Sequence, residues 1–112
     1  MDTSLDSLDP KMKPLAIALI SKCEASGIPI RVINTRRTAT EQAINVKNGV
    51  SWVKHSKHQD GMAIDICPVE LLATKNWSPQ SALWQTLGKI GKELGLIWGG
   101  DWKKRDMGHF EL

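Results

Sequence analysis

Two short stretches of the sequence carry side chains that could together hold a metal ion. Residues 56–65 read Ser-Lys-His-Gln-Asp-Gly-Met-Ala-Ile-Asp and contain His58 and Asp65, while a stretch near the end contains Asp106 and His109. A catalytic zinc takes three protein ligands of the His, Asp or Glu kind and keeps one position open for water. It also profits from a nearby carboxylate that can accept a proton from that water. The sequence therefore predicts a hydrolytic zinc site with His58, Asp65 and His109 as ligands and Asp106 as the carboxylate.

Each of these residues, taken alone, has a plainer explanation. A single histidine such as His58 is commonly a surface-loop residue, and His109, beside Phe110, could be a buried core histidine. Asp65 could pair with an arginine or accept hydrogen bonds from backbone amides. It is nevertheless informative, because a carboxylate between apolar neighbours in a strand is costly unless it is paired or bound to a metal. A turn at Gly61 would let His58 and Asp65 converge.

The ligand stretches must be positioned by strands. Residues 63–67 form a predicted core strand, and residues 108–112 form the last strand of the chain. Side chains alternate along a strand, so Glu111 should point to the same side as His109 and could contact it. Two further strands are predicted over residues 28–34, a β-branched run with Pro29 at its start or on an edge, and over residues 96–98.

Three helices are predicted from apolar residues spaced three and four apart. The first begins at residue 10 or 14 and ends at residue 26, the second covers residues 39–48, and the third covers residues 79–94. A glycine directly follows each range. The second helix begins with a capping box, in which Thr38 accepts from the Glu41 amide and Glu41 reaches back. The third is predicted to begin with Ser78 as N-cap and Pro79 at the first helical position.

This order of elements predicts an α+β fold with a small, largely antiparallel sheet and helices packed on one side. A length of 112 residues fits a single domain, 1–112, with its own core. The hydrophobic content of 41% and charged content of 24% are those of a soluble globular protein. Cys23 and Cys67 are expected to be reduced, buried thiols, and Trp84 and Trp98 core residues, whereas Trp52 and Trp102 in loops could line a substrate groove.

Charge and hydropathy exclude some classes of function. The formal net charge of +3 is compatible with attraction to an anionic partner such as a cell wall. It is too small for a nucleic-acid binder without a recognisable basic helix or finger, so no nucleic-acid partner is expected. The longest apolar run, residues 15–20, is too short for a signal-peptide core or a membrane span. We therefore expect synthesis in the cytoplasm without an export signal, and no stable membrane insertion.

The pattern Ser-x-His-x-x-Gly-x-Ala-x-Asp over 56–65, followed by Asp106-x-x-His109, resembles the zinc peptidases of the D-Ala-D-Ala carboxypeptidase and phage L-alanyl-D-glutamate endopeptidase (endolysin) group. Their fold is shared with lysostaphin-type enzymes and the hedgehog signalling domain. Arg37-Thr38, with Gln42 five residues after the arginine, resembles that family's Arg-Ser/Thr-x-x-x-Gln segment. Residues 99–102, Gly-Gly-Asp-Trp, resemble the approach to its last ligand. The resemblance thus covers about two-thirds of the chain, in four separate segments.

The resemblance implies a role for each matched residue. It makes His58, Asp65 and His109 the ligands of one zinc ion per chain, and Asp106 the general base. Arg37 would bind the substrate or stabilise the oxyanion of the transition state, and Ser56 and Gln42 would contribute to substrate binding. Arg36 neighbours Arg37, but the spacing to Gln42 favours Arg37, and His55 lies outside the matching pattern.

The resemblance implies a zinc metallopeptidase that hydrolyses an amide bond in the peptidoglycan stem peptide, with L-Ala–D-Glu as the expected bond. An endolysin of this kind, expected as a monomer, would reach the wall only after another protein permeabilises the inner membrane. The nearest alternative is a D-Ala-D-Ala carboxypeptidase or dipeptidase with the same zinc and base. The alternative from another class is a non-catalytic, zinc-stabilised binding module.

Overall fold

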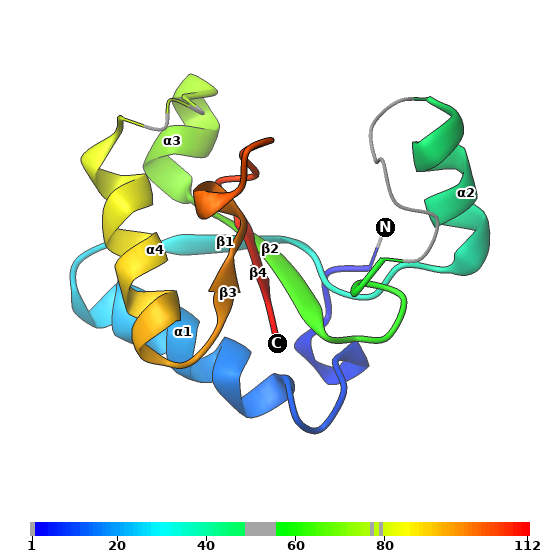
Figure 1. The fold of residues 1–112 in the computed structure, drawn as a ribbon. Helices are drawn as coiled ribbons and strands as arrows, with labels where there is room; N and C mark the ends of the chain where they lie inside the picture. The colour runs from blue at the N-terminus through cyan, green and yellow to red at the C-terminus, as the bar shows by residue number, and fades with distance from the viewer. Residues whose placement is uncertain (1, 49–55, 77, 79) are drawn as a thin grey trace.

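One antiparallel sheet carries two of the three predicted metal ligands on adjacent strands. The computed structural model describes residues 2–48, 56–76, 78 and 80–112. Within these ranges the strands are β1 (Ile30–Asn34), β2 (Ala63–Pro68), β3 (Ile97–Trp98) and β4 (His109–Glu111). Their order in the sheet is β1-β2-β4-β3, and each neighbouring pair is antiparallel (Figure 1). Pro29 directly precedes the edge strand β1, as predicted.

The helices form a layer against this sheet, with one exception. The described residues contain the α-helices α1 (Lys13–Ala25), α2 (Ala39–Lys47), α3 (Val69–Thr74) and α4 (Ala82–Glu93), with the short 3-10 helices η1 (Leu5–Ser7) and η2 (Gly99–Asp101). Helices α1 and α4 pack on each other, α1 also contacts β1, and α4 also contacts β3. Helix α2 stands apart from this layer, at the right of Figure 1. The predicted α+β fold with a small antiparallel sheet is confirmed.

Helix α2 begins where the sequence predicts, because the capping box forms. The Glu41 amide donates to Thr38 Oγ1 at 3.1 Å, and the Thr38 amide donates to Glu41 Oε1 at 3.0 Å. Two N–H groups at the start of the helix are thereby satisfied. The box fixes the point where α2 begins, and Arg36 and Arg37 lie in the short connection between β1 and this helix.

The region between β2 and β3 differs from the prediction in two respects. Helix α3 follows Pro68 immediately, where no helix was predicted, and ends with Lys75 in the left-handed conformation at φ 54°. The predicted N-cap Ser78 is wrong, because α4 begins three residues later, after Ser81. Ser78 instead shapes a turn ahead of the helix: its hydroxyl accepts from the Gln80 amide, and its carbonyl accepts from the Ser81 amide.

The core lies between the sheet and helices α1 and α4. Its fully buried side chains come from the sheet and from both helices and include Leu19, Ile64, Ile66, Trp84, Leu87 and Phe110. Cys23 and Cys67 are buried and not joined in a disulfide, and Trp84 and Trp98 are buried, as predicted. Trp52 lies outside the described residues. Among the helices of the described ranges, none has the length and apolar character that a bilayer span requires.

Candidate metal and catalytic site

The pairing of β2 with β4 brings Asp65 and His109 together. These residues are directly opposite each other in the antiparallel register, and directly opposed residues present their side chains on the same face of a sheet. The Asp65 Oδ1 atom lies 3.0 Å from His109 Nδ1. His109 is buried, with 6% of its surface exposed, whereas Asp65 keeps partial access to solvent. The sheet itself therefore places two of the predicted ligands.

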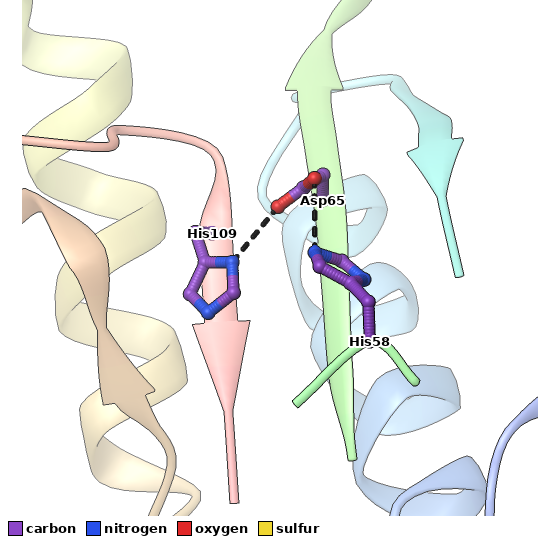
Figure 2. A group of neighbouring side chains, drawn as sticks. All are labelled: His58, Asp65 and His109. Carbon is purple, nitrogen blue, oxygen red and sulfur yellow. Dashed lines mark hydrogen bonds and ion pairs between the residues drawn. The ribbon is translucent and has the colours of Figure 1, made fainter. Parts of the chain in front are cut away.

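The third predicted ligand, His58, lies in a turn that precedes β2. The buried Ser56 hydroxyl accepts from the His58 amide at 3.1 Å. The carbonyl of His58 in turn accepts from the amide of Gly61, which has a φ of +70° that favours glycine. In this turn His58 Nε2 lies 3.1 Å from Asp65 Oδ2. Figure 2 shows the Asp65 carboxylate between the two imidazoles.

Each imidazole is oriented by an oxygen on its other side. His58 Nδ1 donates to the Thr35 carbonyl at 2.7 Å, because a carbonyl can only accept. His109 Nε2 lies 2.8 Å from Glu111 Oε1. In both rings the remaining nitrogen faces Asp65, which is the arrangement that metal-binding histidines use to fix tautomer and ring orientation. The contact from Glu111 agrees with the sequence prediction, whereas Thr35 was not predicted.

Thr35 is itself held by the N-terminal segment. The Thr35 amide and hydroxyl donate to the Asp2 carbonyl at 2.7 and 3.1 Å. The neighbouring Arg36 donates from Nε to the Ser7 carbonyl at 3.0 Å, and from its guanidinium to the Asp60 carbonyl at 3.3 Å. Arg36 therefore ties the N-terminal segment to the His58 turn. This structural role separates it from Arg37.

The donor set fits a zinc ion. One atom from each of His58, Asp65 and His109 can be chosen so that all three lie within 4.8 Å of one another. Ligand bonds of 2.0–2.2 Å in a tetrahedron put ligand atoms about 3.3–3.6 Å apart. The Asp65 oxygens lie slightly closer than this to the two histidines, at 3.1 Å from His58 Nε2 and 3.0 Å from His109 Nδ1. His58 Nε2 is buried and makes no hydrogen bond. This nitrogen faces the Asp65 carboxylate at 3.1 Å, and a cation bound between them would satisfy both.

The site is strongly polarised. Burial opposes ionisation of Asp65, but the hydrogen bond to His109 and the nearby His58 imidazole outweigh it and hold the pKa of Asp65 well below its usual range. Burial likewise acts to lower the pKa of His109, but hydrogen bonds to Asp65 and Glu111 raise that pKa to about 9. Metal-free, the site therefore favours an ionised carboxylate beside a protonated His109.

The stability of the metal-free protein should consequently depend on pH. A histidine whose folded pKa is raised stabilises the fold fully below its unfolded value of 6.5, and this stabilisation is lost as pH rises through about 9. Urea denaturation in the presence of a chelator should show a lower midpoint at pH 9.5 than at pH 6.5. His109→Ala should flatten this dependence, and an unchanged slope in that variant would assign the effect to other groups.

Asp106 lies beside the ligands without joining them. Its Oδ2 atom is 3.9 Å from His109 Nδ1, and its side chain is 48% exposed. Burial of part of the group and the nearby Asp65 charge raise the pKa of Asp106, while the positive charge of Arg37 is among those that lower it. A raised pKa and access to solvent suit a carboxylate that must exchange protons.

The structure shows contacts for some of the other predicted site residues and does not describe the side chains of the rest. Arg37 lies at the entrance of α2, where its amide donates to the His58 carbonyl at 3.0 Å, and its charge acts on Asp106. Ser56 is buried beneath His58. Gln42 belongs to α2, but its side chain lies outside the described part of the structure, as does His55. The Trp102 ring lies 5.0 Å from the His109 ring, at the edge of the ligand cluster.

Replacing Glu111 should weaken metal binding without unfolding the protein. Glu111 accepts from the nitrogen of His109 that faces away from Asp65, and loss of such a partner typically costs about 10- to 100-fold in metal affinity. Competition with a chromophoric chelator should show this loss in Glu111→Ala and a smaller one in Glu111→Gln, which keeps an acceptor oxygen. Glu70→Ala, an exposed acid on α3, is the matched control. Unchanged affinity in Glu111→Ala would remove this residue from the site.

Comparison with known proteins gives consistent matches. A family model described as D-alanyl-D-alanine carboxypeptidase matches residues 49–112. The L-alanyl-D-glutamate peptidase of Listeria phage A118 is 32% identical over 100 residues, which cover 88% of this chain and 35% of the phage enzyme. The chain thus spans about a third of the length of that relative.

Solved structures share the fold. The L-Ala D-Glu endopeptidase ChiX of Serratia marcescens superposes with a TM-score of 0.73 at 24% identity, over 96% of this chain and 82% of that one. The vancomycin resistance D,D-pentapeptidase VanY, solved in complex with Zn(II), superposes with a TM-score of 0.67 at 16% identity, over 93% of this chain and 71% of that one.

Proposed function

The chain belongs to the D-alanyl-D-alanine carboxypeptidase family, and from this premise we propose that it is a zinc peptidase that cuts the peptidoglycan stem peptide between L-alanine and D-glutamate. The observation that carries the proposal is the grouping of His58, Asp65 and His109, with Asp106 beside them and partly open to solvent. Three ligands and an adjacent, uncoordinated carboxylate are what a hydrolytic zinc site requires.

Zinc, when bound, polarises the scissile carbonyl and lowers the pKa of the attacking water to about 7. Asp106 orients that water, accepts its proton and passes it to the leaving amine. Arg37 carries a guanidinium group that stabilises the negative charge developing on the carbonyl oxygen. Thr35 and Glu111 hold the two imidazoles so that their other nitrogens face Asp65, and these nitrogens together with the Asp65 carboxylate would hold the metal.

The residues proposed to bind substrate differ in their support. Arg37 lies next to the His58 turn, and its charge reaches Asp106, so it can act on a substrate held at the metal. The Ser56 hydroxyl is occupied by the His58 amide, which supports a role in positioning His58. Substrate contacts by Ser56 and Gln42 stay predictions.

The choice of bond rests on the relatives, because the chemistry at the metal is the same for every amide. An L-alanyl-D-glutamate peptidase and an L-Ala D-Glu endopeptidase are among the similar proteins. A D-Ala-D-Ala carboxypeptidase with the same ligands and base is the second candidate, favoured by the description of the family model. A non-catalytic module is disfavoured because Asp106 lies beside the cluster without closing it.

Mass spectrometry of digested peptidoglycan tests the proposal directly. Purified protein loaded with zinc should release fragments with a new amino terminus on D-glutamate and a new carboxyl terminus on L-alanine. Release of free D-alanine instead would favour the carboxypeptidase. Intact peptidoglycan after prolonged digestion by zinc-loaded protein would overturn both and favour the binding module. Action at the cell wall follows from the proposal, whereas the monomeric state and delivery through an opened membrane stay predictions.

A further inference from the structure

A closed loop beside the metal ligands presents positive charge. The amides of Trp102 and Asp106 both donate to the Gly99 carbonyl, at 3.2 and 2.9 Å. A Cβ on Gly99 would lie 2.5 Å from the Asp106 carbonyl oxygen and 3.1 Å from the Cβ of His109. The base of the loop therefore packs closely against His109, and residues 103–105 form its tip.

The tip consists of Lys103, Lys104 and Arg105, and all three are exposed. The tip gathers three of the 15 basic residues of the chain at consecutive positions. Asp101, the acid that precedes the loop, already pairs with Lys92 at 3.1 Å. Clustered charge of one sign next to a site raises the local concentration of substrates of the opposite sign.

The three cations are held close to the reacting groups. Successive Cα atoms are about 3.8 Å apart, so each tip residue has its Cα within about 8 Å of the Cα of Trp102 or Asp106. Trp102 contacts the His109 ring, and Asp106 lies 3.9 Å from the same ring. Lysine and arginine side chains on this tip are therefore long enough to reach a substrate group on the carbon next to the scissile amide.

We propose that the tip of this loop, Lys103-Lys104-Arg105, recognises the free α-carboxylate of the D-glutamate on the leaving side of the scissile bond. This inference rests on the proposed function. In the stem peptide D-glutamate is linked onward through its γ-carboxyl group, so the α-carboxylate stays free on the carbon that carries the scissile nitrogen. A carboxylate at that place distinguishes this substrate from its amidated form, in which the same carbon carries a neutral amide.

The experiment compares two synthetic stem peptides, one with the free α-carboxylate and one with the α-carboxamide, and measures kcat/KM for each. The wild-type protein should prefer the carboxylate peptide by about three- to tenfold, the range expected for partly solvated contacts between a carboxylate and clustered cations. The variant Lys103→Gln/Lys104→Gln/Arg105→Gln should lose most of this preference while keeping its zinc, because no ligand is changed. Zinc content is measured on the same samples.

The control variant is Lys11→Gln/Lys22→Gln/Lys89→Gln, which removes the same charge from exposed lysines on other parts of the surface. It should keep the preference. An equal fall in kcat/KM for both peptides in the tip variant would overturn the inference. So would a loss of preference in the control as large as in the tip variant, because either result would indicate non-specific electrostatic attraction. An unchanged preference in the tip variant would overturn it as well. If the wild-type protein binds zinc but cuts neither peptide, the proposed function fails first.

Discussion

Asp65→Asn should leave a folded protein that no longer retains zinc and whose hydrolysis of the stem peptide falls to the background. The substitution keeps the shape of the side chain and removes the charge that lies between His58 and His109. A neutral amide is a poor zinc ligand. The metal supplies several kcal/mol of transition-state stabilisation, so the rate should fall by about 1000-fold or more. Metal analysis after dialysis and a peptidoglycan turbidity assay measure the two losses.

His58→Ala should behave in the same way but with a larger cost in stability. The ring of His58 is 2% exposed, and its removal leaves a cavity and an unpaired Thr35 carbonyl. The remaining histidine, His55, lies outside the ligand motif, so His55→Ala is the matched control and should retain zinc. Full zinc content in Asp65→Asn would mean that the metal is held elsewhere, and the proposed function would fail with it.

The grouping of His58, Asp65 and His109 was predictable because these residues are chemically unusual where they stand. Asp65 interrupts an apolar strand, and such a carboxylate needs a partner. His109 lies in a short final strand that must pair with the rest of the sheet. In the structure this strand, β4, pairs with β2, and the antiparallel register places His109 opposite Asp65. Glu111 was predictable for a related reason, since alternation along β4 puts it on the same face as His109.

Thr35 could not be predicted, because it acts through its backbone. Its carbonyl accepts from His58, and any residue type offers a carbonyl. The anchoring of Thr35 joins its amide and its hydroxyl to the Asp2 carbonyl, a backbone acceptor far away in the sequence. A sequence pattern records side-chain types at fixed spacing, and so it carries no signal for such a contact.

The errors between β2 and β3 have a local cause. Ser78-Pro79 has the residue types of an N-cap and a first helical residue, but the helix begins after Ser81, which offers the same hydroxyl three residues on. Helix α3 has six residues, no side-chain cap at its start and a lysine in place of the glycine that commonly ends a helix. Both features leave the usual start and stop signals ambiguous or missing.

Asp106→Asn should separate catalysis from metal binding. The side chain is 48% exposed and lies 3.9 Å from His109 Nδ1, outside the group of ligand atoms, so zinc content and thermal stability should stay close to those of the wild-type protein. An amide of the same shape cannot accept the proton of the attacking water. General-base catalysis typically contributes about 100- to 10,000-fold, and kcat should fall within that range. Steady-state hydrolysis of a synthetic stem peptide gives the number.

The pH dependence makes this test sharper. Burial and the Asp65 charge raise the pKa of Asp106, and only the ionised carboxylate can accept a proton, so the rate of the wild-type protein should rise with pH on its acid limb. Asp106→Asn should lose that dependence along with its rate. Asp101→Asn, which alters an exposed acid paired with Lys92, should keep both. Loss of zinc together with activity in Asp106→Asn would make Asp106 a fourth ligand, and a closed site of that kind favours a structural metal over a catalytic one.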